Sequence, residues 1–287
     1  MKRKVYEQLL EWKSQEHHKP LILNGVRQCG KTYVLKEFGR QEFDSLAYVS
    51  CDRNVNLQAI YSGDFDVARI IQGLSALTGV DIIPGKTLIF LDEVQAFPQA
   101  LEALKYFCED APEYHIVVAG SLLGVALHAG VSFPVGKVQT LRLFPMDFEE
   151  FLMAMGEEQL LKLMHSHDYE LMNAFHEKLK DLLRQYYYVG GMPEVVKAFA
   201  ENKLLNQVRS LQNEILSNYA SDFSKHAPSQ EVPRIDMVWQ SILGQLSKEN
   251  KKFVYGVLKK GGRAKEFELA IQWLVGAGLG YKITKVS

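Results

Sequence analysis

Residues 21–32 read LILNGVRQCGKT. The apolar triplet 21–23 is typical of a short buried strand, and the run from the end of this stretch to about Phe38 suits a helix. Residues 25–32 fit the pattern G-x-x-x-x-G-K-[ST], which marks a phosphate-binding loop between a strand and a helix. Its glycines let the backbone curl until the N–H groups form an anion nest, and the positive end of the following helix faces the bound phosphates. The stretch therefore predicts a P-loop fold that binds a nucleotide.

The residue types of this loop suggest individual roles. We expect Lys31 to contact the β- and γ-phosphates of ATP, which also makes it a catalytic candidate, and Thr32 to ligate Mg²⁺. Cys29 lies near a helix N-terminus and close to Lys31, and both features lower a thiol pKa, but a small residue that simply fits is the favoured interpretation. The residues expected to bind the nucleotide are Gly25, Arg27, Gln28, Cys29, Gly30, Lys31, Thr32 and Tyr33.

A second motif, LIFLDE at residues 88–93, ends a buried strand with two carboxylates. Asp92 is expected to hold Mg²⁺, directly or through water, and Glu93 to act as the general base on the attacking water. Ser121, which follows Gly120 at the end of a later strand, is a candidate to orient that water. The alternatives are an acidic helix cap at residues 92–93 and a helix-capping role for Ser121.

Apolar runs predict the sheet that joins these motifs. The runs are continuous rather than alternating, as in strands that are buried on both faces, so we expect an α/β fold: a P-loop parallel sheet with helices on both faces. Ligands of such sheets bind at the carboxyl ends of the strands. The expected strands are 21–23, 46–50, 87–91, 116–119 and 138–143, and the expected helices 3–16, 67–74 and 100–108.

The order of these elements favours ATP over GTP. An intervening strand and a Glu after the Asp mark the P-loop branch that hydrolyses ATP with a carboxylate base. Strand 46–50 lies between the phosphate loop and the acidic strand, and the segment 69–74 adds a second strand if it is counted. The guanine-reading pattern Asn-Lys-x-Asp is absent, because Asn202-Lys203 and Asn250-Lys251 both lack the Asp.

Composition bounds the class of protein. The chain has 287 residues, of which 47% are hydrophobic, and a net charge of −1, which argues against a surface coated with positive charge for nucleic acid. Its three cysteines form no disulfide framework. The basic N-terminus lacks the apolar stretch of a signal peptide, and the apolar run near residues 116–127 is too short to span a bilayer. We expect a cytoplasmic protein without a membrane partner.

The strand signal fades after Pro145. We expect a P-loop ATPase core at residues 1–145, an all-helical lid at 146–228 and a small unit at 229–287. The small unit has helical patterns near residues 235–246 and 264–275 and a final strand-like run at 279–286.

Along nearly its whole length the sequence resembles the prokaryotic AAA-type, archaeal-ATPase-like P-loop ATPases, which usually carry a C-terminal nuclease-like domain of unknown function. The resemblance implies an ATPase core, a helical lid and a winged-helix unit. Relatives usually continue beyond the position of Ser287, so no nuclease-like domain is expected here. The segments that carry the resemblance are 25–32, 91–93, 119–121, 143–151 (LFPMDFEEF), 188–194 (YVGGMPE) and 248–274.

The resemblance also bears on single residues. Pro193 belongs to a Gly-x-Pro element that packs near the nucleotide base in related ATPases, although a tight turn between lid helices would explain the same residues. Lys137 stands where many relatives carry Arg, which puts an arginine finger at that position in doubt. Arg142 and Arg184 are the other candidates, each with a surface salt bridge as the alternative.

Residues 248–265 form a basic segment. Seven Lys or Arg residues against one Glu give it a local charge of +6. In a helix-turn-helix unit this charge could contact DNA phosphates, although no base-reading arrangement is evident and a solvated basic face is the alternative.

Together these patterns predict an ATP-binding AAA-type protein, an Mg²⁺-dependent ATPase that couples hydrolysis to movement of the lid and the winged-helix unit, with DNA as a candidate partner. The alternative is a nucleotide-gated signalling switch with little turnover. A small-molecule kinase is disfavoured by Glu93 and by the lack of a substrate-pocket motif. A homo-oligomer is a candidate assembly, since AAA-type relatives often act as rings.

Overall fold

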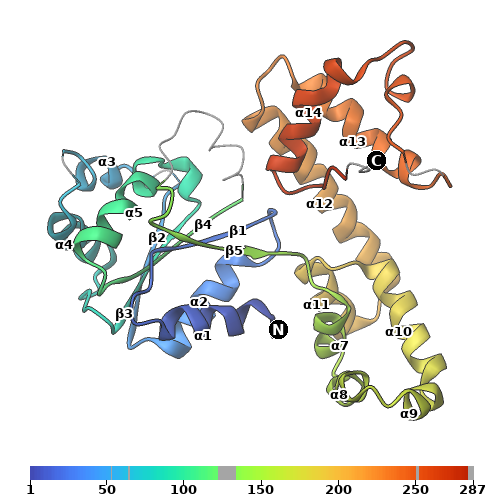
Figure 1. Ribbon diagram of the computed structural model, residues 1–287, viewed down its shortest axis with the longest axis horizontal. Coiled ribbons are helices and arrows are strands. Elements are labelled where there is room, and N and C mark those ends of the chain that lie inside the picture. The colour runs from blue at the N-terminus through green and yellow to red at the C-terminus, as the bar shows by residue number, and fades with distance from the viewer. Residues whose placement is uncertain (53, 64, 122–133, 250–251, 284–287) are drawn as a thin grey trace. The chain divides into compact units, whose positions relative to one another are not determined.

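The computed structural model describes residues 1–52, 54–63, 65–121, 134–249 and 252–283 (Figure 1). They form two compact units, Met1–Arg209 and Ser210–Ser287. Within the described ranges, none of the helices combines the length and the apolar character that are needed to cross a lipid bilayer.

A parallel sheet organises the first unit. Its spatial order is β2-β3-β4-β1-β5, and every pair of neighbours runs in parallel. The five expected strands and the parallel sheet are therefore confirmed. In space β4 lies between β1, which leads into the phosphate loop, and β3, which carries the acidic motif. The strands are β1 (Leu21–Gly25), β2 (Ser45–Ser50), β3 (Thr87–Asp92), β4 (His115–Gly120) and β5 (Gln139–Leu143).

Helices cover both faces of this sheet. Ile89 packs in one core with residues of α3, α4 and α5, whereas the side chain of Leu88 lies against α2 at Gly39. Neighbouring residues of a strand point to opposite faces, so the two groups of helices lie on opposite sides (Figure 1). The helices are α1 (Val5–Ser14), α2 (Lys31–Glu42), α3 (Asn56–Ile60), α4 (Val67–Thr78), the 3₁₀ turn η1 (Val94–Ala96) and α5 (Gln99–Asp110).

The segment 69–74 belongs to α4 and is not a strand. Val67, Ile70 and Leu74 are its buried residues, and their spacing is that of one face of a helix. In the sequence, therefore, one strand, β2, separates the phosphate loop from the acidic strand.

Helices follow β5 through the rest of the first unit. Asp147 begins α7 with a capping box, in which its carboxylate accepts from the Glu150 N–H while the Glu150 carboxylate accepts from the Asp147 N–H. Leu152, Leu160 and Leu182 form the apolar centre of this helical region. The helices are α7 (Phe148–Ala154), α8 (Glu158–Ser166), α9 (Tyr169–Ala174), α10 (His176–Val189) and α11 (Pro193–Asn202).

The second unit is helical where it is described. The ring of Phe223 packs edge-on against Trp239 and Trp273, with centroids 5.6 and 5.5 Å away. The predicted helices near 235–246 and 264–275 are present, but residues 279–283 form no strand and residues 284–286 lie outside the described part. The winged-helix assignment thus stays a prediction. The elements are α12 (Leu205–His226), which begins in the first unit, α13 (Val232–Leu246), η3 (Tyr255–Val257) and α14 (Ala264–Gly276).

Two histidines stack in the interior of the first unit, at the start of β4. The ring centroids of His18 and His115 are 3.8 Å apart, and the ring of Trp12 lies roughly perpendicular to both, with centroids 5.6 and 5.5 Å away. Burial lowers the pKa of His18, and burial together with repulsion from His18 lowers the pKa of His115 to about 4. The pair is therefore neutral at pH 7.

This stack predicts a loss of stability in mild acid. Between pH 6.5, the ordinary pKa of histidine, and about 4, the unfolded chain binds a proton at His115 that the folded chain does not bind. The free energy of unfolding should fall with pH by up to about 1.4 kcal/mol per pH unit for this group. Urea titrations of His115→Phe should show a shallower decline over this range, and those of the exposed His17→Phe should match wild type. An unchanged slope in His115→Phe would exclude the pair as the acid-sensitive element.

Candidate nucleotide-binding site

The phosphate loop is shaped by a close approach of β5. A side chain on Gly25 would come within 2.3 Å of the Leu143 carbonyl oxygen, so only glycine fits at this position. Gly30 has φ +96°, in the left-handed region that glycine adopts freely, and it caps α2. The loop consequently forms a cradle at a helix N-terminus, the usual geometry of a phosphate site.

Lys31 lies inside this cradle. Its ammonium group donates to the carbonyl oxygens of Gly25 at 2.8 Å and Val26 at 2.9 Å. Burial lowers the pKa of Lys31, an effect that nearby acidic groups, among them Glu93 and Asp92, oppose. The buried ammonium group is thus held against the carbonyl oxygens at the start of the phosphate loop.

The two residues expected to hold Mg²⁺ are joined to each other. The Thr32 hydroxyl donates to Asp92 Oδ2 at 2.8 Å, and the Glu93 N–H donates to Asp92 Oδ1 at 3.1 Å. The hydroxyl of Tyr48 also donates to Asp92 Oδ2, at 3.3 Å. Burial and the nearby Asp92 charge raise the pKa of Tyr48 to about 12, so the phenol keeps its proton. Hydroxyl and carboxylate oxygens are ligands that suit Mg²⁺.

Glu93 follows Asp92 in a strained conformation. Its φ of 53° and ψ of 42° are left-handed, which costs a non-glycine residue roughly 1–2 kcal/mol. Its carboxylate accepts a hydrogen bond from the side-chain amide of Gln95. Such strain is typical of functional sites, where the surroundings fix the backbone.

Ser121 ends β4 at the same edge of the sheet. Its neighbour Gly120 pairs with Asn24, immediately before the phosphate loop, and the Ser121 side chain is buried. Since β4 lies between β1 and β3, this topology brings Ser121 between the loop and Asp92. The helix-capping alternative for Ser121 concerns the residues that follow it, and 122–133 lie outside the described part.

The other expected nucleotide-binding residues differ in exposure. Cys29 is fully buried and its pKa is raised by that burial, which favours a small residue that fits over a reactive thiol. Gln28 has a left-handed backbone, with φ 63°. Arg27 and Tyr33 are exposed, and Tyr33 lines a cavity of about 530 Å³ together with the N-terminal residues 1–4.

The Gly-x-Pro element at the start of α11 lies against the phosphate loop. A side chain on Gly30 would come within 3.6 Å of Pro193 Cγ. The segment is fixed by Met146, whose N–H donates to the Gly191 carbonyl at 2.6 Å and whose carbonyl leaves no room for a side chain on Gly191. Pro193 is thus close to the phosphate loop, and its expected place near the nucleotide base stays a prediction.

Arg3 was missed by sequence reasoning. Its guanidinium is buried and donates to the carbonyl oxygens of Cys29 at 2.8 Å and Phe144 at 2.6 Å. It also forms a buried ion pair with Glu150, with 3.1 Å between Nε and Oε1. One side chain therefore holds the phosphate loop, the end of β5 and α7. Glu150 stood within a segment that carried the family resemblance, but no local pattern linked it to Arg3.

The arginine-finger candidates are engaged elsewhere. Arg184 forms an exposed ion pair with Asp181 at 3.0 Å on α10, which matches the surface salt-bridge alternative. Lys137 pairs with Glu109 at 2.8 Å. Arg142 is exposed, and its guanidinium lies 5.1 Å from the ring centroid of Phe144.

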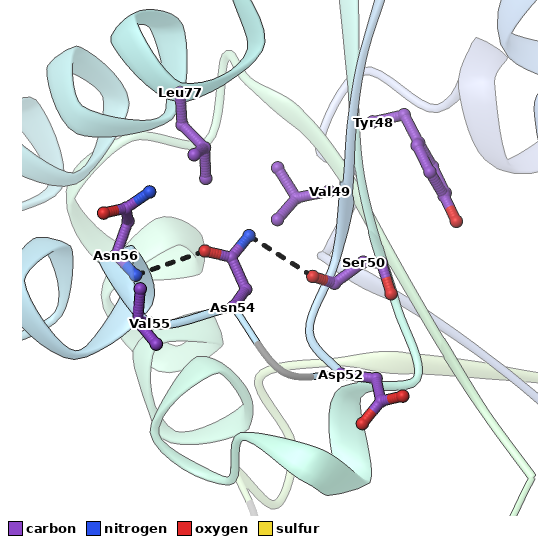
Figure 2. A pocket seen from close by; sticks show the side chains of 8 residues that line it. All are labelled: Tyr48, Val49, Ser50, Asp52, Asn54, Val55, Asn56 and Leu77. Atoms are coloured by element: carbon purple, nitrogen blue, oxygen red, sulfur yellow. Dashed lines mark hydrogen bonds between the residues drawn. The ribbon is translucent and has the colours of Figure 1, made fainter.

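A separate cavity of about 430 Å³ lies beyond the end of β2 (Figure 2). The Asn54 amide closes a turn on its wall, because it donates to the Ser50 carbonyl at 3.4 Å and accepts from the Asn56 N–H at 3.2 Å. Figure 2 shows the Tyr48 side chain on the far side of β2 from Val49 and Asn54. The cavity is lined by residues of β2, of the segment that follows it and of α4, and by none of the phosphate loop.

Comparisons with known proteins agree with this fold. Residues 17–152 match the family model of an AAA domain, and residues 180–287 match a domain of unknown function (DUF8612). The structure is similar to that of the Walker-type ATPase PABY2304 of Pyrococcus abyssi, with a TM-score of 0.60 and 14% identity over 96% of this chain and 89% of the other. A search of curated proteins gave no match.

Two further solved structures are similar at lower scores. One is the ORC2 protein of Aeropyrum pernix in ADPNP–ADP complexes, with a TM-score of 0.45 and 14% identity over 96% of this chain and 84% of that one. The other is Drosophila ORC bound to DNA, with a TM-score of 0.43 and 13% identity over 98% and 81%. The AAA match and the PABY2304 likeness show an AAA-type P-loop ATPase-like fold, and neither family match names a nuclease.

The Arg3–Glu150 pair yields a stability prediction. Arg3→Met leaves the Glu150 carboxylate buried without its cation and should lower the free energy of unfolding by about 3–5 kcal/mol. Lys4→Met is the matched control, because the Lys4 ammonium pairs with Asp147 and Glu149 at the surface. It should cost less than about 1 kcal/mol.

Urea unfolding of both variants measures the difference. Arg3→Met combined with Glu150→Gln should recover part of the loss, since the glutamine is neutral and still completes the capping box. Equal costs for Arg3→Met and Lys4→Met would show that the buried pair does not stabilise the fold.

Proposed function

We propose that this chain, whose fold is that of AAA-type P-loop ATPases, binds ATP with Mg²⁺ at residues 25–32, hydrolyses it, and transmits the cycle to its helical lid and C-terminal unit. The observation that carries the proposal is the hydrogen bond between Thr32 and Asp92. It joins two oxygen ligands from separate motifs beside a carboxylate, Glu93, that is suited to act as a base. A phosphate loop alone would support binding only.

In this proposal the protein residues divide the work. Loop N–H groups and Lys31 hold the phosphates, and Thr32 and Asp92 hold the metal ion, which neutralises phosphate charge when bound. Glu93 accepts a proton from a water molecule that Ser121 helps to orient. The water oxygen bonds to the terminal phosphorus while the bond from that phosphorus to the bridging oxygen breaks, which gives ADP and inorganic phosphate.

Contacts within the first unit support coupling to the lid. Arg3 binds the Cys29 carbonyl and Glu150 of α7 at the same time, and Pro193 at the start of α11 lies beside Gly30. A change in the loop on nucleotide binding or hydrolysis therefore has a direct route to two lid helices. A switch with little turnover would use the same contacts.

DNA is the proposed partner of the C-terminal unit. The Lys and Arg side chains of the basic segment are exposed where they are described, with Lys251 outside that part. Arg263 caps α14, so positive side chains gather at the positive end of a helix, an arrangement that suits a phosphate backbone. The ammonium group of Lys259 is 3.9 Å from Glu266 Oε2. At this length the ion pair is weak, so the ammonium group can also interact with a phosphate.

Phosphate release tests the enzymatic proposal. Wild type with ATP and Mg²⁺ should release phosphate, and Glu93→Gln should still bind ATP while releasing it about 10²–10⁴-fold more slowly, the usual contribution of a general base. Lys31→Ala, as a binding control, should lose both. Binding is measured by calorimetry with a non-hydrolysable ATP analogue.

The other outcomes are informative. Equal release by wild type and Glu93→Gln would exclude Glu93 as the base. Tight binding without release by either protein would favour the nucleotide-gated switch.

Fluorescence anisotropy with a random-sequence DNA duplex tests the proposed partner. Replacing Lys259, Lys260 and Arg263 by Gln should weaken binding and reduce the dependence of log K on log salt by about 0.9 for each phosphate that the variant no longer neutralises. The control replaces Lys178, Lys180 and Arg184 of α10 by Gln and removes the same charge. If both triple variants lose equal affinity, or wild type does not bind, the proposal of a DNA-binding segment is wrong.

A further inference from the structure

We infer that Gln95 is a positioning residue for Glu93, holding its carboxylate in the orientation that a general base requires. The inference rests on the proposed ATPase function and extends it to a residue that neither sequence motif contains. Three observations on the residues from Asp92 to Gln95 carry it.

The first is the hydrogen bond itself. Gln95 Nε2 donates to Glu93 Oε2, so one carboxylate oxygen is held while Oε1 is not used by this bond. Because a glutamate carboxylate only accepts hydrogen bonds, the amide must present its nitrogen to it. The direction of the Gln95 amide is therefore set by Glu93.

The second observation is the backbone that creates this bond. The left-handed conformation of Glu93 ends β3 abruptly, and the 3₁₀ turn Val94–Ala96 brings Gln95 back toward it. Residues two apart in an ordinary helix do not face each other, so the pair depends on this strained turn. Strain that persists at one residue requires surroundings that fix it.

The third observation is the other end of the amide. Gln95 Oε1 is shielded from solvent and has no hydrogen-bond partner among the described residues. No hydrogen bond from the described part of the chain to its oxygen therefore holds the Gln95 amide in place. A shielded acceptor without a donor is also unfavourable in free energy. The geometry is explained by the bond to Glu93 and not by a separate structural role of Gln95.

Gln95→Met tests the inference, because methionine keeps the length of the side chain and removes the amide. The control is Gln72→Met, at an exposed glutamine on α4. We expect kcat of Gln95→Met to fall about tenfold, part of the ~10²–10⁴-fold contribution of a general base. The Kd for ATP with Mg²⁺ should stay within about twofold of the control, since a group that acts only through Glu93 does not bind the ground state. The melting temperature should also match the control.

A double variant sharpens the test. In single-turnover assays with excess protein, Gln95→Met added to Glu93→Gln should cause no further loss, because the residue acts through the carboxylate. An unchanged kcat in Gln95→Met would overturn the inference, as would an equal loss in both backgrounds or a loss matched by weaker ATP binding or a lower melting temperature. If wild type releases no phosphate, the proposed function fails and the inference fails with it. If wild type is active and Gln95→Met equals it, only the inference fails.

Discussion

The buried guanidinium of Arg3 is the interaction on which the geometry of the candidate site depends. A cation removed from water is costly unless it is paired and hydrogen-bonded. Its partners come from three segments of the chain, which are the phosphate loop at Cys29, the end of β5 at Phe144 and α7 at Glu150. These segments cannot separate without exposing or orphaning a charge. The phosphate loop and the start of the helical region at α7 are therefore held by the same side chain.

Close backbone contacts reinforce this arrangement. The Leu143 carbonyl lies where a side chain on Gly25 would be, and the Met146 carbonyl lies where one on Gly191 would be. Both carbonyls belong to a short connection that begins at Leu143, the last residue of β5. That connection therefore touches the phosphate loop at one end and the Gly-x-Pro element at the other, and glycine is required at both contacts because nothing larger fits. Close backbone packing thus explains why the family resemblance includes residues 143–151 and 188–194.

The sequence was sufficient where the signal is local. Strands buried on both faces give continuous apolar runs, and the phosphate loop needs a fixed spacing of glycines before a lysine, so the sheet and the loop were predicted correctly. The sequence did not predict contacts between distant residues, such as the pair of Arg3 and Glu150, which are 147 residues apart. Tyr48 reaches Asp92 only through the pairing register of β2 with β3. Gln95 depends on a left-handed residue that no composition rule indicates. The segment 69–74 was ambiguous because a short apolar run fits a strand or a helix equally.

Several polar groups of the site are hydrogen-bonded to one another. Lys31 is bound by the carbonyls of Gly25 and Val26, and Thr32 by Asp92. In the proposed cycle a phosphate attracts the Lys31 ammonium, and these two carbonyls then lose their donor. A buried carbonyl without a donor is unfavourable, so the loop must rearrange or admit water. Arg3 donates to the carbonyl of Cys29, in the same loop, and pairs with Glu150 of α7. A rearrangement of the loop therefore acts on α7 through Arg3. In the proposed cycle, coupling between the nucleotide and α7 would rest on these hydrogen-bond requirements.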